Sequence, residues 1–144
     1  MSSQSVPVCQ PGSDPEVRPG LRLILRALWS LLAHDLFLRR HSSFFALYEH
    51  LRSVPVAPRD ASPTAVDRVK AAIDEACIWY PKRALCLQRS VVAVTLLRRH
   101  GVSAQFVYGV QQLPFKAHAW VEVAGVVVND RQDVLREYCV VERI

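Results

Sequence analysis

The spacing of apolar residues changes once along the chain, at Gly101, and this change limits the folds that the chain can adopt. A mostly apolar run begins near residues 82–85 and continues to His100. Its length, basic end and following glycine indicate a helix, although its valine-rich middle prefers a strand by propensity. Helices followed by antiparallel strands predict an α+β domain whose sheet packs on this central, buried helix. The apolar period becomes two after the glycine, which predicts strands over 102–110, 117–123 and 126–130 and a final one within 134–144.

Helical spacing also occurs before the central run. Apolar residues recur every three or four positions over 21–38, with Asp35 as the exception, and a shorter helix is expected from Ser42 or Ser43 to Leu51. Ser62-Pro63 has the pattern of a third helix start, and Pro81 ends that helix. The expected organisation is a flexible, proline-rich arm (1–19), an N-terminal helical segment (20–53), a Pro-rich linker (54–62) and a core (63–144).

Composition excludes several classes of protein. A chain of 144 residues with 51% hydrophobic and 22% charged residues fits one folded domain and is not disordered. Its net charge of +5 is common in ordinary proteins and does not by itself indicate a nucleic-acid partner. The N-terminus lacks a secretory signal, and charges interrupt the apolar stretch 21–38, so we expect no transmembrane segment. No C-x-x-C spacing occurs among Cys9, Cys77, Cys86 and Cys139, and no metal or cofactor is expected. Four irregularly spaced cysteines in a chain of this length are typical of reduced thiols in the cytoplasm.

Three residues carry chemistry that can cleave an amide bond. Cys86 falls at the start of the central helix, shortly after Lys82 and Arg83, where the helix end and the two cations favour the nucleophilic thiolate. His118 lies in a predicted strand between two alanines, which leave its imidazole accessible, and Asp130 ends the next strand. A thiol nucleophile, an imidazole base and a carboxylate that orients the imidazole form a complete hydrolytic set.

The hairpin that joins these two strands decides whether His118 and Asp130 can meet. A two-residue turn at 124–125 would pair Val123 with Val126 and would place the two side chains on opposite faces of the sheet. A three-residue loop would place them opposite each other on one face, with their Cβ atoms about 5 Å apart. The catalytic hypothesis therefore predicts the three-residue loop, or another register of the same parity.

Four segments of the sequence match motifs of a known family. Together they resemble the lasso-peptide biosynthesis B proteins, and more narrowly their stand-alone leader peptidase of the B2 type. Those proteins are similar to the transglutaminase-like, papain-like cysteine hydrolases. The resemblance covers residues 80–130 well and the rest in outline, and Ala-His-Ala-Trp-Val-Glu is its most specific motif. The four segments are residues 86–90, 96–102, 114–122 and 129–130.

The resemblance implies a cytoplasmic cysteine protease that removes the leader from a ribosomally made lasso-peptide precursor. By motif matching, Cys86 is its nucleophile, His118 its base and Asp130 its orienting carboxylate, with Asn129 as the alternative to Asp130. The resemblance also implies two partner proteins, a separate leader-recognition protein and an asparagine-synthetase-like, ATP-using cyclase. Residues 63–144 are then the transglutaminase-like protease core.

Two other functions stay open from the residues alone. The same site can transfer an acyl group to an amine instead of water, which a transglutaminase-like fold also allows. Alternatively, basic helices followed by a hairpin describe a winged helix that binds DNA through Arg89, Arg98 and Arg99, although the central helix is too apolar to be a recognition helix.

Several smaller roles are also undecided. The backbone N–H of Cys86 is the natural donor to an oxyanion, and the second donor is open among Gln88, Tyr80 and Arg83. Trp120 either shields the His–Asp pair from water or only fills the core. The three cysteines other than Cys86 are expected to be small buried hydrophobic residues.

Overall fold

The computed structural model describes residues 18–41, 43–58 and 61–144, and most of the arm expected over 1–19, with Cys9, lies outside these ranges. Helices come first and antiparallel strands follow, with one short helix between the last two strands, which confirms the predicted α+β class. The elements are α1 (Leu21–Arg40), α2 (Phe44–Ser53), α3 (Ala65–Trp79), α4 (Cys86–Arg99), β1 (Ala104–Gln111), β2 (Lys116–Val123), β3 (Val126–Val127), α5 (Val134–Glu137) and β4 (Cys139–Arg143).

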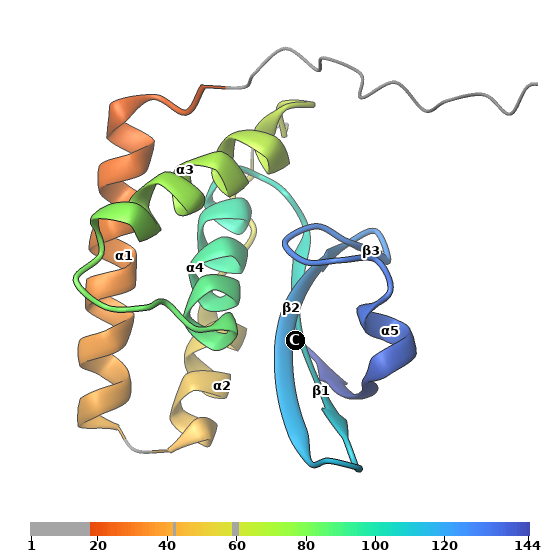
Figure 1. The fold of residues 1–144 in the computed structure, drawn as a ribbon. Helices are drawn as coiled ribbons and strands as arrows, with labels where there is room; N and C mark the ends of the chain where they lie inside the picture. The colour runs from red at the N-terminus through yellow and green to blue at the C-terminus, as the bar shows by residue number, and fades with distance from the viewer. Residues whose placement is uncertain (1–17, 42, 59–60) are drawn as a thin grey trace, which may run out of the picture.

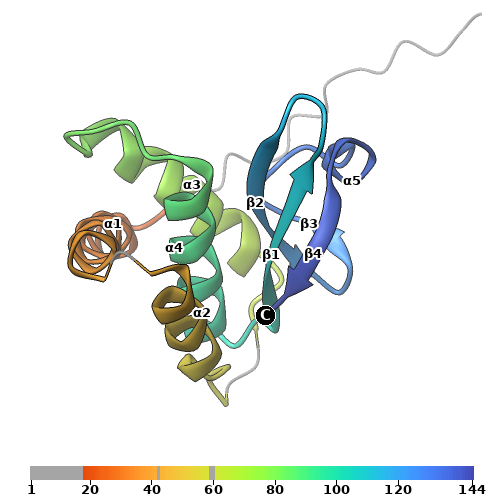
Figure 2. The same cartoon turned by 90° about the horizontal axis from the view of Figure 1, so that it is seen from below.

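The four long helices form a layer on one face of the sheet, and α4 lies at its centre (Figure 1). This helix packs against α1 and α3 on its outer side and against β1 and β2 on its inner side. Seen from below, α1, α2 and α3 lie around α4, whereas α5 lies on the opposite face of the sheet (Figure 2). Every residue from Ser90 to Arg98 is buried as a result, which explains why this helix is apolar on all sides.

One hydrophobic core joins the helices to the sheet. Leu31 of α1 and Leu47 of α2 are fully buried in the same cluster as Val92 of α4 and Phe106 of β1. The helical segment predicted over 20–53 therefore packs as part of the same core as the rest of the chain. A second, smaller cluster lies on the other face of the sheet, where Trp120 is fully buried beneath α5.

The sheet has the strand order β3-β2-β1-β4, and all neighbours are antiparallel. A two-residue turn joins β2 to β3, and both Ala124 and Gly125 have positive φ, the combination that a type I′ turn requires. Val123 pairs with Val126, so the three-residue loop predicted for the catalytic site is wrong. The strand expected over 126–130 is also shorter than predicted, because β3 ends at Val127.

Two further boundaries differ from the sequence-based expectation. The helix expected from Pro63 begins at Ala65, because the preceding residues form a turn closed by a hydrogen bond from the Ala65 N–H to the Ser62 carbonyl (2.9 Å). The segment 134–144, expected as one strand, begins with the short helix α5 before β4.

One face of α1 exposes large apolar side chains at helical spacing. These residues, which we call the α1 stripe, are Leu21, Leu25, Trp29, Leu32 and Leu36. Arginines flank them on the same helix, at Arg22 and Arg26 near its start. Among the described residues, no helix combines the length and apolar content that a membrane crossing needs.

Candidate active site

Cys86 is the first residue of α4, so the free backbone N–H groups of the first helical turn lie around it. The start of this helix is fixed by Gln88, whose side-chain oxygen accepts a hydrogen bond from the Leu85 N–H (3.1 Å). The amide nitrogen of Gln88 donates to Asp35 of α1 (3.2 Å), which also accepts from Lys82 (2.8 Å). This bond to Lys82 holds the pKa of Asp35 below its ordinary value. The long first helix thus anchors the loop that leads into Cys86.

Sequence reasoning left the role of Asp35 unexplained, although the residue carried a signal. It is the one acidic residue in the apolar helical pattern of 21–38, and a carboxylate at such a position needs a cationic or hydrogen-bonding partner. Lys82, 47 positions later, is that partner.

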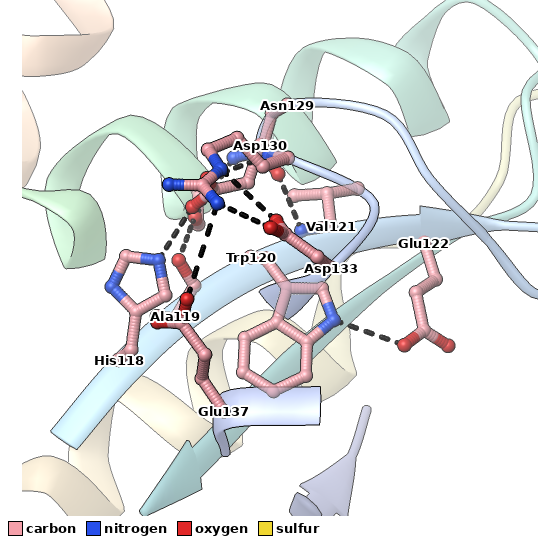
Figure 3. A network of polar contacts seen from close by, with 11 residues as sticks. His118, Ala119, Trp120, Val121, Glu122, Asn129, Asp130, Asp133 and Glu137 are labelled. Atoms are coloured by element: carbon pink, nitrogen blue, oxygen red, sulfur yellow. Dashed lines mark hydrogen bonds and ion pairs between the residues drawn. The ribbon is translucent and has the colours of Figure 1, made fainter. Parts of the chain in front are cut away.

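His118 and Asp130 are in direct contact. The imidazole Nε2 and a carboxylate oxygen of Asp130 lie 2.5 Å apart, and the other carboxylate oxygen accepts from the backbone N–H of Arg131 (2.7 Å; Figure 3). Both side chains are partly buried. Since the neutral imidazole places its proton on the nitrogen that faces the carboxylate, Nδ1 is left with the lone pair that a general base needs.

The contact forms even though the two-residue turn gives the parity that was expected to separate the side chains. In an uninterrupted hairpin of this register, Asp130 would lie opposite Ala119 and would point to the face away from His118. The chain instead leaves the sheet after Val128, whose N–H donates to the Val121 carbonyl (2.9 Å). Asp130 therefore lies outside the strand, where strand parity does not determine its direction.

Asn129, the alternative partner of the imidazole, makes other contacts. Its side-chain oxygen accepts from the Val121 N–H (2.7 Å), and its amide nitrogen donates to the hydroxyl of Ser90 in α4 (2.9 Å). Ser90 in turn donates to the carbonyl of Ala119 in β2 (2.9 Å). Asp130, rather than Asn129, is the residue whose side chain contacts the imidazole of His118.

Aromatic rings lie beside His118 on the sheet face opposite α4. The ring centroids of His118 and Tyr138 are 5.2 Å apart, and those of His118 and Trp120 are 6.2 Å apart. Trp120 is fully buried and donates its indole N–H to Glu122 (2.9 Å), which also accepts from Arg143 (3.0 Å). Trp120 therefore fills the core and also lies beside the imidazole, so the two roles considered for it are compatible.

A cavity of about 320 Å³ opens where α4 faces the edge of β2. Its lining shows which predicted site residues the fold brings together: Cys86 and Asp130 both contribute to it. His118 is not among the lining residues, because its ring lies beside Trp120 on the face of the sheet that points away from α4. Contact between the Cys86 thiol and the imidazole therefore stays a prediction. The full lining is Cys86, Arg89, Ser90, Ala119, Asn129 and Asp130.

This edge of β2 is open beside the cavity, because β3 pairs only with Glu122 and Val123. The Val121 N–H and carbonyl both point away from β1, toward the side of β3. The backbone groups of Ala119, two residues earlier, point the same way. The Ala119 carbonyl is taken by Ser90, and its N–H faces the open edge.

The three side chains considered as a second oxyanion donor lie outside the lining of the cavity. Gln88 directs its amide toward α1, and Tyr80 is buried in the helical core. Neither of them, nor Arg83, lines the cavity. The Ala119 N–H, which sequence reasoning missed, is a donor on the cavity side of the sheet.

The other described cysteines differ from each other. Cys77 is half-buried, and burial raises the pKa of its thiol. Cys139 is exposed, so the expectation that it is a buried hydrophobic residue is wrong. Cys86 is half-buried at the cavity. Within the described ranges, no group of three His, Cys, Asp or Glu side chains has the arrangement of a metal site.

Two of the three arginines proposed to contact DNA are engaged within the protein, whereas the third, Arg99, is exposed. Arg98 is 9% exposed and donates to four backbone carbonyls, those of Leu51, Val54, Ala104 and Ile144. Arg89 forms an ion pair with Asp74 of α3. These contacts, together with a four-stranded sheet packed on α4, do not support the winged-helix alternative.

Three features together define a class of protein. A helix begins with a cysteine, it packs on an antiparallel sheet, and a histidine of that sheet contacts an aspartate that comes after the end of the edge strand. The profile of the Transglutaminase-like superfamily matches residues 28–143, and the chain belongs to this superfamily. This membership confirms the fold class and the family resemblance predicted from the motifs.

A particular relative supports the narrower resemblance. The chain is similar to the microcin J25-processing protein McjB of Escherichia coli, with 36% identity over 59 residues. The match covers 41% of this chain and 28% of McjB, so it spans less than a third of that relative's length. No solved structure matches the chain.

Proposed function

We propose that this protein is a cysteine peptidase that removes the leader from a ribosomally made lasso-peptide precursor. In this proposal Cys86 is the nucleophile, His118 the general base and Asp130 the carboxylate that orients the imidazole. The observation that carries it is the hydrogen-bonded His118–Asp130 pair, whose Asp130 lines the same cavity as Cys86 at the start of α4. The similarity to McjB, a processing protein by name, supports a peptide precursor as the substrate.

The proposed reaction has two halves. In the first, His118 accepts the thiol proton at Nδ1, and the sulfur of Cys86 attacks the carbonyl carbon of the leader–core bond. The resulting oxyanion accepts hydrogen bonds from the Cys86 N–H and, as our candidate second donor, the Ala119 N–H. The C–N bond then breaks, and the imidazolium gives its proton to the leaving amine of the core.

In the second half, a water molecule attacks the thioester between Cys86 and the leader. His118 accepts a proton from this water, and the C–S bond breaks as the sulfur takes that proton back. The leader leaves as a carboxylic acid, and the free thiol is restored. The partly buried carboxylate of Asp130 stabilises the imidazolium in both halves.

Acyl transfer to an amine is the second candidate, because the chain belongs to the transglutaminase-like superfamily. It would share the thioester at Cys86, but an amine rather than water would attack it. Mass spectrometry of the products distinguishes the two: peptidase activity yields a free leader acid and a core with a free amino terminus, whereas transfer yields a new amide.

We further propose that the protein acts in the cytoplasm with a separate leader-recognition protein and an asparagine-synthetase-like cyclase. The cavity of about 320 Å³ is too small to hold a whole leader, which supports a second protein that presents the substrate. Such a protein would raise the local concentration of the cleavage site at Cys86.

Cleavage of a precursor in the presence of its recognition protein tests the proposal. Cys86→Ala and His118→Ala are each expected to lower the rate by about a hundredfold or more, and Asp130→Asn by a smaller factor, because these groups act in the reacting unit. Cys139→Ala is a matched control on an exposed cysteine and should retain full activity. Wild-type turnover by Cys86→Ala would rule out the proposed nucleophile.

A further inference from the structure

A polar pair, the buried Ser90 and the half-buried Asn129, lies between α4, β2 and the segment after β3, and the proposed chemistry does not use it. Ser90 is fully buried, and its hydroxyl both donates to the Ala119 carbonyl and accepts from Asn129, each at 2.9 Å. The oxygen of Asn129 accepts from the Val121 N–H at 2.7 Å (Figure 3). Buried polar groups in such a closed set have well-defined positions, because each lost bond would leave an unsatisfied partner.

The Asn129 side chain replaces a bond of the sheet. In a regular antiparallel pair, Val121 and Val128 would exchange two backbone hydrogen bonds. The Val128 N–H does donate to the Val121 carbonyl, but the Val121 N–H donates to the Asn129 side chain instead of the Val128 carbonyl. This exchange lets the chain leave the sheet at Val128 without an unsatisfied N–H on β2.

The departure from the sheet is what brings Asp130 to His118. If β3 continued in its register, Asp130 would pair with Ala119 and would point to the α4 face, because the turn has two residues. The imidazole lies on the other face, beside Trp120. The His118–Asp130 contact therefore depends on the bonds that end the strand early.

The same pair joins the nucleophile's helix to the base's strand. Ser90 follows Cys86 by four positions on α4, so both side chains lie on one face of that helix, and both line the cavity. The Ser90 hydroxyl is bonded to the residue directly after His118. Loss of this hydrogen bond would allow α4 and β2 to shift relative to each other at the site.

We propose that Ser90 and Asn129 are positioning residues that hold Asp130 against His118 and so fix the imidazole with its proton on Nε2. Their hydrogen bonds go to Ala119, to Val121 and to each other, so in this proposal they act through Asp130 and not on the reacting atoms. The inference rests on the proposed function for its kinetic consequence, but its structural part, the orientation of His118, can be measured without any substrate.

The first experiment observes the imidazole directly. In ¹H and ¹⁵N NMR spectra of the full chain, the hydrogen-bonded Nε2 proton of His118 is expected as a downfield signal that Asp130→Ala removes. Ser90→Ala and Asn129→Ala should also remove or broaden this signal, whereas Ser90→Thr, which keeps the hydroxyl, should retain it. Thr95→Val is the matched control, since Thr95 is a buried hydroxyl residue of α4 whose oxygen has no hydrogen-bond partner among the described residues.

A folding defect is separated from a positioning defect by Asn129→Asp. This nearly isosteric side chain keeps an acceptor for the Val121 N–H but loses the donor to Ser90, so the fold should persist while the imidazole signal weakens. Persistence of the wild-type Nε2 signal in folded Ser90→Ala and Asn129→Ala would overturn the proposal. This result would not depend on whether the protein cleaves a precursor.

The second experiment is a double-mutant cycle on precursor cleavage. Ser90→Ala alone is expected to lower kcat/KM about tenfold or more, because small misplacements of a catalytic group are costly. In the Asp130→Ala background it should have almost no further effect, since the carboxylate that it positions is already gone. An equal loss in both backgrounds would show a general structural role and would also overturn the proposal. Absence of cleavage by the wild type would instead count against the proposed function alone.

Discussion

The imidazole of His34 is a buried base inside the helical layer. It is 7% exposed, and its Nδ1 donates to the Ser30 carbonyl (2.7 Å), so the neutral form is the one that the fold accommodates. Burial, and to a lesser extent the nearby His50 and Arg99, lowers its pKa below the ordinary value of 6.5. The unfolded chain therefore binds a proton here at a higher pH than the folded chain does.

This difference predicts that acid weakens the fold through His34. Between the folded pKa and 6.5, the unfolded state holds more protons at this site, so the free energy of unfolding decreases as the pH falls below about 6.5. Urea unfolding at pH 7.5 and 5.5 measures the loss. His34→Gln should show a smaller loss than the wild type, and His41→Gln, on an exposed histidine of the same region, should show the wild-type loss. An unchanged loss in His34→Gln would contradict the prediction.

At the scale of elements, Gly109 sets how closely β1 approaches its neighbours. A Cβ atom at this position would lie 2.8 Å from the Cys139 carbonyl oxygen and 2.9 Å from the Trp120 ring. Gly109→Ala is expected to destabilise the protein by about 3 kcal/mol, because neither a backbone oxygen nor a fully buried indole can yield easily. Gly125→Ala, in open space at a φ of +78°, should cost only about 1 kcal/mol. Denaturant unfolding measures both, and the reverse order of the two costs would contradict this account.

Arg98 joins α4 to three segments that are distant in the sequence. Its guanidinium donates to backbone carbonyls at the end of α2, at the start of β1 and at the chain terminus. Arg98→Met should cost about 3 kcal/mol or more, because it leaves several buried carbonyls without donors. The adjacent, exposed Arg99→Met should cost less than about 0.5 kcal/mol. Equal unfolding midpoints for the two variants would show that these bonds contribute little.

The elements and the site could be predicted from the sequence to different extents. Apolar periodicity predicted the helices, the central place of α4 and the α+β order, because these depend on burial along a regular element. The meeting of His118 with Asp130 followed from motif matching, but its geometry did not follow from strand parity. A side chain, Asn129, takes a backbone bond and ends β3, and such an exchange between distant residues leaves no periodic signal. The contacts of Ser90 and of Arg98 were missed for the same reason.

At the scale of the whole molecule, the proline-rich segment 54–62 does not divide the protein into independent parts. Leu31 of α1 is fully buried in the same cluster as α4 and the sheet. Asp35, also in α1, is bonded to Gln88 at the start of the helix that carries Cys86. The N-terminal helices therefore support the candidate site, and we expect the described chain to unfold as one cooperative unit.

A substitution in α1 tests this cooperativity. Leu31→Ala should lower the free energy of unfolding by about 3 kcal/mol through the cavity that it leaves, whereas Leu25→Ala, on a side chain of the α1 stripe that is 54% exposed, should cost less than about 0.5 kcal/mol. Native-state hydrogen exchange should show that Leu31→Ala reduces the protection of the slowest amides of β2 and α3 by the same free energy as those of α1. Loss of protection confined to α1 and α2 would mean that these helices open as a separate unit. The sheet, α3 and α4 would then keep their stability without α1 and α2.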